Sequence, residues 1–255
     1  MKKILVISTV LFLSTFMHAQ VTIIAHRGAS YLAPENTLAS AKLAWELNAD
    51  GVEVDIYLSN DNKIMVIHDS HTRRVSDQDY KIRETRAKIL RTVDVGSYKD
   101  IKYKGEKIPF LKEEMKLIPP GKELVIEIKC KSEIIPYLKK VLKKYEKDKK
   151  YQFICFDLQT ILDTKKAFPD HACYWLCNNT ESLMKNINII AESNLEGVSL
   201  KHTIIDEGVM KLAQSFNLEV WTWTVNDVKE AKRLVNLGVK GITTDRPGWL
   251  RENLF

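Results

Sequence analysis

Three acidic residues occupy positions from which their carboxylates could converge. Glu53 and Asp55 lie two residues apart in the apolar run 51–58, so both side chains project from one face if that run is a strand. Glu127 lies at the end of another apolar run. Converging carboxylates are costly when they are unpaired, and a hard divalent cation such as Mg²⁺ or Ca²⁺ accounts for all three. The alternative is that each acid pairs with a basic side chain; as a set, they predict one divalent metal ion.

Two basic residues accompany these acids. Arg27 follows the apolar run 21–25, and Lys129 stands two residues after Glu127. Arginine offers a planar fork of donors and lysine a point charge, and both suit phosphate oxygens. Together with a cation, they predict a pocket for an anion such as a phosphate ester.

Two histidines could carry protons near neutral pH. His26 directly precedes Arg27, and His68 follows the apolar run 64–67. Phosphoryl transfer needs groups that remove and supply protons while charge on the phosphate oxygens is stabilised. We therefore interpret His26 and His68 as an acid and base pair, and we assign no role to the other histidines of the mature chain.

The run 64–67 must return as a hairpin, because only residues 59–63 separate it from the preceding strand and a parallel crossover needs more. A loop of two or four residues would place His68 opposite Asp55. A loop of three residues would instead place it beside Val54. In either case the hairpin carries His68 toward the acidic residues.

Apolar runs alternate with amphipathic stretches along the chain, the pattern of repeated strand and helix units around a parallel sheet. The predicted strands are 21–25, 51–58, 124–128, 152–156, 172–176, 197–200, 219–224 and 241–244. The predicted helices are 34–47, 132–145, 158–167, 181–192, 206–216 and 226–237.

Eight strands with intervening helices close most economically into a (β/α)8 TIM barrel of the α/β class, with a doubly wound open sheet as the alternative. Working groups of such barrels stand at the carboxyl ends of the strands. Residues at those predicted ends are His26, Arg27, Glu53, Asp55, Glu127, Lys129, Trp223 and Asp245.

One stretch has no place in this alternation. Residues 71–116, after the second strand and its hairpin, are expected to form a small inserted subdomain over the barrel mouth, where functional loops collect. The remainder of 20–255 is expected to form a single barrel domain.

The first residues have the pattern of a secretory signal peptide. Lys2 and Lys3 precede an apolar run of about 14 residues, shorter than the roughly 20 that span a membrane. We expect cleavage after Ala19, so that 1–19 is removed and the mature chain is periplasmic or secreted, with an uncleaved anchor as the alternative. No stable membrane insertion is expected of the rest.

Charge and cysteine content limit the other possibilities. The formal net charge is +6, and two of the lysines lie in the leader, so nucleic-acid binding is not expected. The four cysteines could form up to two disulfides after export. Cys173 and Cys177 lie too far apart along one predicted strand to bridge each other.

The segment from His26 to Thr37, which reads HRGASYLAPENT, is followed by GVEVD at 51–55 and by VIHD at 66–69. With GEKIP at 105–109, EIK at 127–129, WTVN at 223–226 and GITTD at 241–245, this order closely resembles the glycerophosphodiester phosphodiesterase family over nearly the whole mature chain.

The resemblance implies metal-dependent hydrolysis of glycerophosphodiesters to glycerol 3-phosphate and an alcohol. It implies a small-molecule substrate, Glu53, Asp55 and Glu127 as metal ligands, His26 and His68 as the acid and base, Arg27 and Lys129 as phosphate binders, and Trp223 as a pocket wall. Two alternatives remain: a cyclising phospholipase D-like lyase, and a non-catalytic phosphodiester-binding protein.

Overall fold

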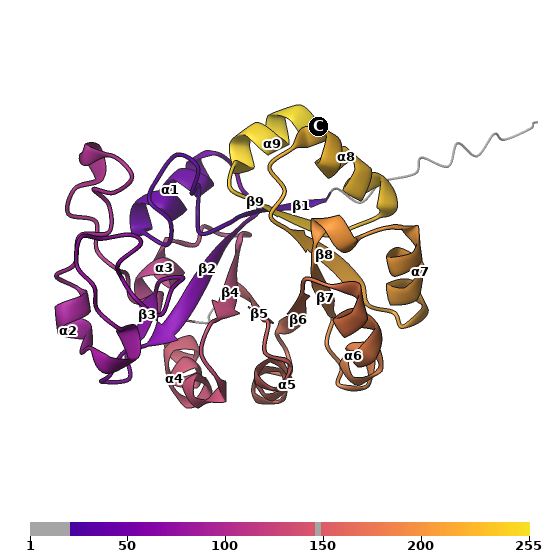
Figure 1. Ribbon diagram of the computed structural model, residues 1–255, viewed down its shortest axis with the longest axis horizontal. Helices are drawn as coiled ribbons and strands as arrows, with labels where there is room; N and C mark the ends of the chain where they lie inside the picture. The colour runs from indigo at the N-terminus through magenta and orange to yellow at the C-terminus, as the bar shows by residue number, and fades with distance from the viewer. Residues whose placement is uncertain (1–20, 146–148) are drawn as a thin grey trace, which may run out of the picture.

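Eight parallel strands form a closed barrel in the computed structural model, which describes residues 21–145 and 149–255 (Figure 1). The strands are β1 (Thr22–Ala25), β2 (Gly51–Leu58), β4 (Glu123–Ile128), β5 (Lys150–Cys155), β6 (Ala172–Cys177), β7 (Gly197–Lys201), β8 (Glu219–Trp223) and β9 (Gly241–Thr244). Their order is β1-β9-β8-β7-β6-β5-β4-β2, and pairing of β1 with β2 closes the ring. The predicted TIM barrel is therefore confirmed, and the open-sheet alternative is wrong.

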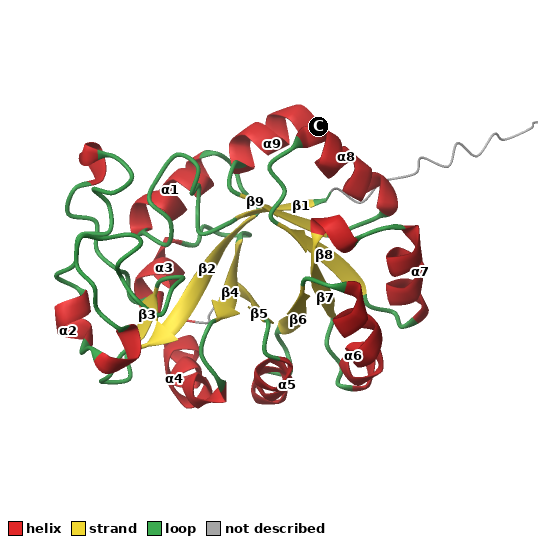
Figure 2. Ribbon diagram, in the orientation of Figure 1, coloured by secondary structure: helices red, strands yellow, loops and turns green. Residues whose placement is uncertain are grey.

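Helices surround this ring of strands (Figure 2). They are α1 (Leu38–Glu46), α3 (Leu111–Leu117), α4 (Ile135–Tyr145), α5 (Leu158–Ala167), α6 (Thr180–Glu192), α7 (Glu207–Ser215), α8 (Val228–Leu237) and α9 (Pro247–Leu254). All six predicted helices are present in the described chain. None of the helices described there is long and apolar enough to cross a bilayer.

Side-chain caps set several helix boundaries. Asp206 and Asp227 accept hydrogen bonds from backbone amides of the first turns of α7 and α8. Gly238 ends α8 with a left-handed φ of 93°. Helix α1 begins at Leu38, later than the predicted residue 34, because Thr37 is its N-cap and accepts from the amide of Ser40.

The β2–β3 hairpin has a three-residue loop. Strand β3 (Ile64–Val66) runs antiparallel to β2, with Ile56 opposite Val66. The amide of Ser59 donates to the carbonyl of Lys63, and Asn62 takes up a left-handed φ of 58° inside the turn. This is the arrangement in which a type I turn is followed by a left-handed residue.

The register of the hairpin continues past β3 and determines which residue of β2 lies level with the backbone of His68. Continued along the ladder, it places His68 level with Val54, so the arrangement with His68 opposite Asp55 is wrong. The amide of Ile67 still donates to the carbonyl of Asp55. The chain leaves the ladder after this bond, and the imidazole reaches the barrel mouth from there.

The segment after β3 forms a small subdomain beside the barrel, at the left of Figure 1. It contains the short helices η1 (Ile82–Glu84), α2 (Ala87–Leu90) and η2 (Ile101–Tyr103). Its own apolar core is formed by Met65, Ile67, Val75, Ile82, Ala87, Leu90, Val93, Val95 and Ile108. Helix α3, which lies within the predicted insertion range, instead packs between α1 and α4 and belongs to the ring of barrel helices.

The cysteines of the described chain are all free thiols: Cys130, Cys155, Cys173 and Cys177. Cys173 and Cys177 lie on one strand, β6, as the sequence indicates.

Candidate active site

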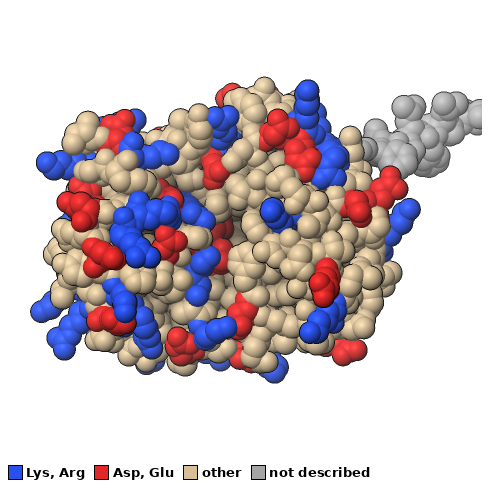
Figure 3. Space-filling view, in the orientation of Figure 1, with Lys and Arg blue, Asp and Glu red and all other residues tan. Residues whose placement is uncertain are grey.

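A cavity of about 220 Å³ opens at the carboxyl ends of the barrel strands. Figure 3 shows the corresponding hollow near the centre of the face, with acidic and basic side chains at its edge. Seven of the eight predicted site residues line this cavity: His26, Arg27, Glu53, His68, Glu127, Lys129 and Trp223. The eighth, Asp55, is fully buried next to them.

The three predicted metal ligands come together. Each of Glu53, Asp55 and Glu127 contributes one carboxylate oxygen to a group whose members lie within 4.8 Å of one another. Asp55 on β2 and Glu127 on β4 are register partners, and Glu53 lies two residues before Asp55 on the same face of β2. All three are buried, with exposed fractions of 1%, 0% and 8% for Glu53, Asp55 and Glu127.

Hydrogen bonds from the first loop occupy one carboxylate oxygen of Glu53 and one of Asp55. Oε2 of Glu53 accepts from the amide of Arg27 at 2.9 Å, and Oδ2 of Asp55 accepts from the side-chain amide of Asn36 at 2.8 Å. Among the described residues, Oε1 of Glu53 and Oδ1 of Asp55 are buried without a hydrogen-bond partner. Nζ of Lys129 lies 3.7 Å from Oδ1 of Asp55. A divalent cation with oxygen ligands fits these free oxygens better than ion pairing alone does.

The electrostatics of the acidic group point the same way. Burial, then the neighbouring Asp55 and Glu127, raises the pKa of Glu53 well above its ordinary value. Burial and Asp55 raise the pKa of Glu127 to about 7. Burial also acts to raise the pKa of Asp55, but Arg27, His68 and Lys129 outweigh it and leave that pKa low. The acids therefore repel one another, and a bound cation would relieve this repulsion.

The two predicted phosphate binders, Arg27 and Lys129, are held by neighbouring acidic side chains. Nη1 of Arg27 donates to Glu35 at 3.0 Å, and its Nε lies 3.2 Å from Asp55. Nζ of Lys129 donates to Glu127 at 2.7 Å. Burial lowers the pKa of Lys129, but Glu127 and Asp55 raise it by more, so the lysine stays charged.

Backbone geometry explains why a glycine follows Arg27. Arg27 has a φ of 55° and Gly28 a φ of 79°, so two successive residues are left-handed. A Cβ on Gly28 would lie 2.4 Å from Oγ of Ser40 in α1. The tight turn after β1, which aims Arg27 at the cavity, therefore requires glycine at position 28.

Asp245 orients His26. Its carboxylate lies 2.7 Å from Nδ1 of His26 and also accepts from Ser30 and Asn226. Burial acts to raise the pKa of Asp245, but these partners have the larger effect and lower that pKa to about 2. An ionised Asp245 therefore fixes the proton on Nδ1 of His26 and leaves Nε2 as the free nitrogen.

His68 has a similar partner next to it in the chain. Its Nδ1 lies 2.6 Å from Asp69, and Nζ of Lys129 lies 3.3 Å from its Nε2. Arg74, from the inserted subdomain, donates to Asp69 at 2.5 Å and twice to Glu35 at 2.7 Å. Burial, with Arg27 and Lys129, lowers the pKa of His68 against the opposing effect of Asp55 and Asp69.

Aromatic rings form the opposite wall. Trp223 packs edge-to-face against Phe156 with ring centroids 5.4 Å apart, and its Nε1 donates to the carbonyl of Ser199 at 3.0 Å. Trp223 therefore lines the cavity as predicted. Phe156, which the sequence did not single out, lines the cavity beside it.

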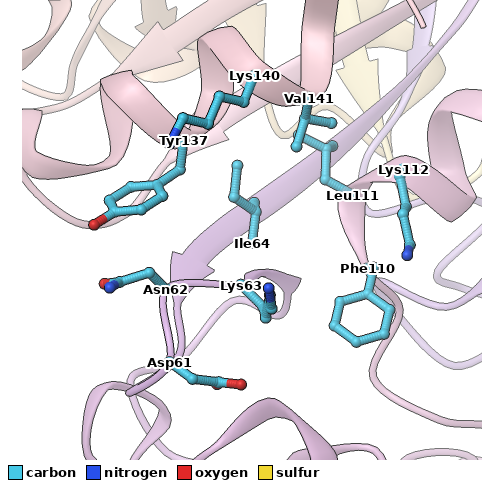
Figure 4. Close-up of a pocket in the computed structure, with 10 residues that line it drawn as sticks. All are labelled: Asp61, Asn62, Lys63, Ile64, Phe110, Leu111, Lys112, Tyr137, Lys140 and Val141. Atoms are coloured by element: carbon cyan, nitrogen blue, oxygen red, sulfur yellow. The ribbon is translucent and has the colours of Figure 1, made fainter. Parts of the chain in front are cut away.

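A second cavity, of about 440 Å³, lies on the outside of the barrel between the β2–β3 turn and α4 (Figure 4). Its lining includes Lys63, Lys112 and Lys140 but only one acid, Asp61. That carboxylate already accepts from Ser59 and from the amide of Ala87. This cavity contains no acid-base or metal-binding group comparable with those at the barrel mouth.

Comparisons with known proteins agree on one family. The model of the "Glycerophosphoryl diester phosphodiesterase family" matches residues 26–249. A putative glycerophosphodiester phosphodiesterase of Bacillus subtilis is 30% identical over 232 residues, which cover 89% of this chain and 96% of the relative. A glycerophosphodiester phosphodiesterase of Caldanaerobacter subterraneus is 30% identical and covers 88% of this chain and 94% of its own.

Solved structures give the same result. A phosphodiesterase of Oleispira antarctica, in complex with the product sn-glycerol-3-phosphate, matches with a TM-score of 0.86 and 29% identity over 91% of this chain and 96% of its own. The glycerophosphodiester phosphodiesterase of Thermotoga maritima matches with a TM-score of 0.75 and 26% identity over 91% of this chain and 98% of its own.

Proposed function

Because the chain belongs to the glycerophosphoryl diester phosphodiesterase family and is a glycerophosphodiester phosphodiesterase, we propose that one divalent cation and two histidines carry out its reaction. The products are sn-glycerol 3-phosphate and an alcohol. The observation that carries the proposal is the group of three buried carboxylates at the cavity of His26 and His68, two of which have an oxygen without a hydrogen-bond partner in the described chain.

Glu53, Asp55 and Glu127 would hold the cation, which is Mg²⁺ or Ca²⁺ by the chemistry of an all-oxygen site. When bound, such a cation polarises a phosphoryl oxygen and stabilises the charge that develops on it. Arg27 and Lys129 face the same cavity and bind the remaining phosphate oxygens.

His26 acts as the base. It lines the cavity at the barrel mouth, and its Nδ1 is held by the ionised Asp245, so Nε2 is free to accept a proton from the attacking water or glycerol hydroxyl. A partly buried carboxylate in this position both orients the imidazole and stabilises the imidazolium that forms.

His68 acts as the acid. It lines both the cavity at the barrel mouth and a neighbouring cavity on the side of the inserted subdomain, so it stands where an alcohol would leave. The negative phosphodiester offsets the charges of Arg27 and Lys129, which favours the protonated form of His68 in the complex. In the net reaction water adds to phosphorus and the bond to the alcohol oxygen breaks; the proton that His26 takes balances the one that His68 gives.

The experiment that tests this proposal uses the mature protein and glycerophosphodiesters with choline, ethanolamine, glycerol and inositol head groups, with and without chelator. We expect release of sn-glycerol 3-phosphate that stops on chelation and returns with Mg²⁺ or Ca²⁺. Phosphorus NMR of the products distinguishes hydrolysis from cyclisation, because a lyase would accumulate a cyclic phosphate. Unchanged hydrolysis after complete removal of divalent cations would contradict the metal site.

We also propose that the enzyme works after export, as a single barrel domain spanning 20–255 with the small subdomain inserted within 71–116. Support for export is the basic and apolar leader at 1–19, which lies outside the described residues. Mass spectrometry of the protein from cell fractions should find Gln20 at the amino terminus in the periplasm or medium. A chain that keeps its leader in the cytoplasm would contradict this.

A further inference from the structure

A third cavity adjoins the one at the barrel mouth that holds the proposed catalytic groups. It has a volume of about 500 Å³ and shares His68 and Lys129 with the catalytic cavity. Its remaining lining comes from the end of β2 and from the first residues of the insertion, including Tyr57, His71 and Arg73. His68 and Lys129 therefore form the boundary between an inner and an outer cavity, and a phosphodiester bound beside them would extend into both.

The two cavities differ in chemistry. The inner cavity contains the acidic group, and much of its wall is apolar, with Ile154, Phe156, Leu176 and Trp223. The outer cavity is lined almost entirely by polar and charged side chains. The two cavities should therefore suit different parts of the substrate.

Basic side chains outnumber acids in the outer cavity. It has three cations, Lys129, Arg73 and Arg74, and one acid, Asp69. Asp69 is already bound to His68 and Arg74. Arg73 is exposed, and within the described chain it forms no ion pair. Figure 3 shows basic side chains gathered between the hollow and the inserted subdomain.

The inner cavity suits the glycerol end of the substrate, which is the same in every glycerophosphodiester. It is the smaller of the two, and most of its lining lies on or directly after barrel strands, as Ser199 and Thr243 do. Glycerol is common to all glycerophosphodiesters, whereas the alcohol varies and needs the larger space. The leaving alcohol then occupies the outer cavity, with its oxygen next to His68.

We propose that the cavity lined by Tyr57, His71 and Arg73 is the head-group subsite, and that it selects alcohols that are anionic, such as a phosphorylated polyol, over quaternary ammonium alcohols. This inference rests on the proposed function of the neighbouring site. A quaternary ammonium group is usually held by several aromatic faces, and this cavity offers only the ring of Tyr57 besides imidazoles. An anionic group instead meets the unpaired guanidinium of Arg73.

The test compares three substrates that share sn-glycerol 3-phosphate: glycerophosphocholine, glycerophosphoglycerol, and glycerophosphoglycerol with a terminal phosphate on its head group. For the wild-type enzyme with saturating cation, we expect kcat/KM to be about tenfold higher for the phosphorylated head group than for choline. The neutral glycerol head group should lie between them. High salt should reduce the differences in kcat/KM among the three substrates, because it screens an exposed charge.

Arg73→Glu should reverse the order of the charged head groups, mainly through KM, and Arg73→Ala should abolish the preference. The matched control is Arg86→Glu, which changes the net charge equally within the same subdomain at an exposed residue that lines neither cavity. That control should keep the wild-type order. Thermal unfolding of each variant checks that the fold is retained, which we expect because Arg73 is exposed and unpaired.

A wild-type enzyme that hydrolyses choline and phosphorylated head groups equally well, or prefers choline, would overturn this inference while leaving the proposed function intact. So would an order that Arg73→Glu and Arg73→Ala both leave unchanged. Failure to hydrolyse any of the three substrates with Mg²⁺ or Ca²⁺ would refute the proposed function and this inference with it.

Discussion

Asp55 and Glu127 stand opposite each other on the neighbouring parallel strands β2 and β4, and their carboxylates meet that of Glu53 at the barrel mouth. This register places three acids together without any contribution from a loop. Because strands hold side chains more rigidly than loops do, the site is formed before substrate arrives. The cost is the burial of these carboxylates and then their mutual repulsion, which together raise the pKa of Glu53 and of Glu127.

We predict that the repulsion among these carboxylates lowers the stability of the cation-free protein against unfolding. Without a cation, Glu53→Gln should unfold at a higher temperature than the wild type, since the wild type must either bury this charge or take up a proton on folding, whereas the amide does neither. Mg²⁺ or Ca²⁺ should stabilise the wild type, by about 2.7 kcal/mol at a hundred times the dissociation constant, and should have little effect on the variant. Thermal unfolding with chelator and with cation provides the comparison. Equal stabilisation of both proteins would place the cation elsewhere.

The two histidines should respond differently to the leaving group. Replacing the alcohol by p-nitrophenol makes a good leaving group that needs no proton. His68→Ala should therefore lose about 10²- to 10⁴-fold in kcat on glycerophosphocholine but much less on the p-nitrophenyl diester, whereas His26→Ala should lose activity on both. Steady-state kinetics on the two substrates measure this difference. The opposite pattern would exchange the two roles.

Asp245 should matter through His26. Asp245→Asn keeps the size of the side chain but removes the negative charge that holds the proton on Nδ1 of His26. We expect kcat to fall by about 10²-fold or more while KM changes little, because the effect falls on proton transfer and not on binding. Ser30→Ala removes another partner of Asp245 and is the milder control. Similar small losses in both variants would show that the carboxylate only supports the loop.

Glu114 should make the stability of the protein depend on pH. Its side chain is 1% exposed, both of its carboxylate oxygens lack a hydrogen-bond partner in the described chain, and burial followed by Glu113 and Glu106 raises its pKa to about 8 from an ordinary 4.5. Between these values the folded protein keeps a proton that the unfolded chain has lost. Stability therefore falls as the pH rises through this window, at up to about 1.4 kcal/mol per pH unit.

The variant Glu114→Gln isolates this contribution. It should match the wild type near pH 5 and exceed it in free energy of unfolding by pH 8, with the difference levelling off above that pH. Urea unfolding across the range measures the difference, and Glu207→Gln, whose side chain is 80% exposed, is the control with no such trend. Parallel curves for Glu114→Gln and wild type would contradict the raised pKa.

Much of the barrel was predictable, because strand and helix follow local patterns. The spacing of Glu53 and Asp55 fixes their shared face, and caps such as Asp227 mark where helices begin. The sequence leaves two arrangements open for the hairpin register. The register depends on the left-handed conformation of Asn62, and the run of asparagine and aspartate around that residue does not specify which of its members is left-handed. Helix α9 was missed because it is short and follows directly on the last strand.

The partners of the histidines were harder to foresee. Asp245 was identified as a polar residue at a strand end but without a role, since 219 residues separate it from His26. Arg74 links Glu35 to Asp69 from within the inserted subdomain, where no periodic pattern guides a prediction. Such contacts depend on how distant loops dock, and a single sequence carries no signal of them beyond residue type.

The most direct test of the account is a crystal structure of the enzyme grown with Mn²⁺ in place of Mg²⁺ or Ca²⁺ and sn-glycerol 3-phosphate, with anomalous scattering used to locate the ion. We predict one strong peak within coordination distance, about 2.0–2.6 Å, of an oxygen from each of Glu53, Asp55 and Glu127, with the phosphate of the product beside it. An active enzyme whose anomalous map shows no ion among these three carboxylates would contradict the account.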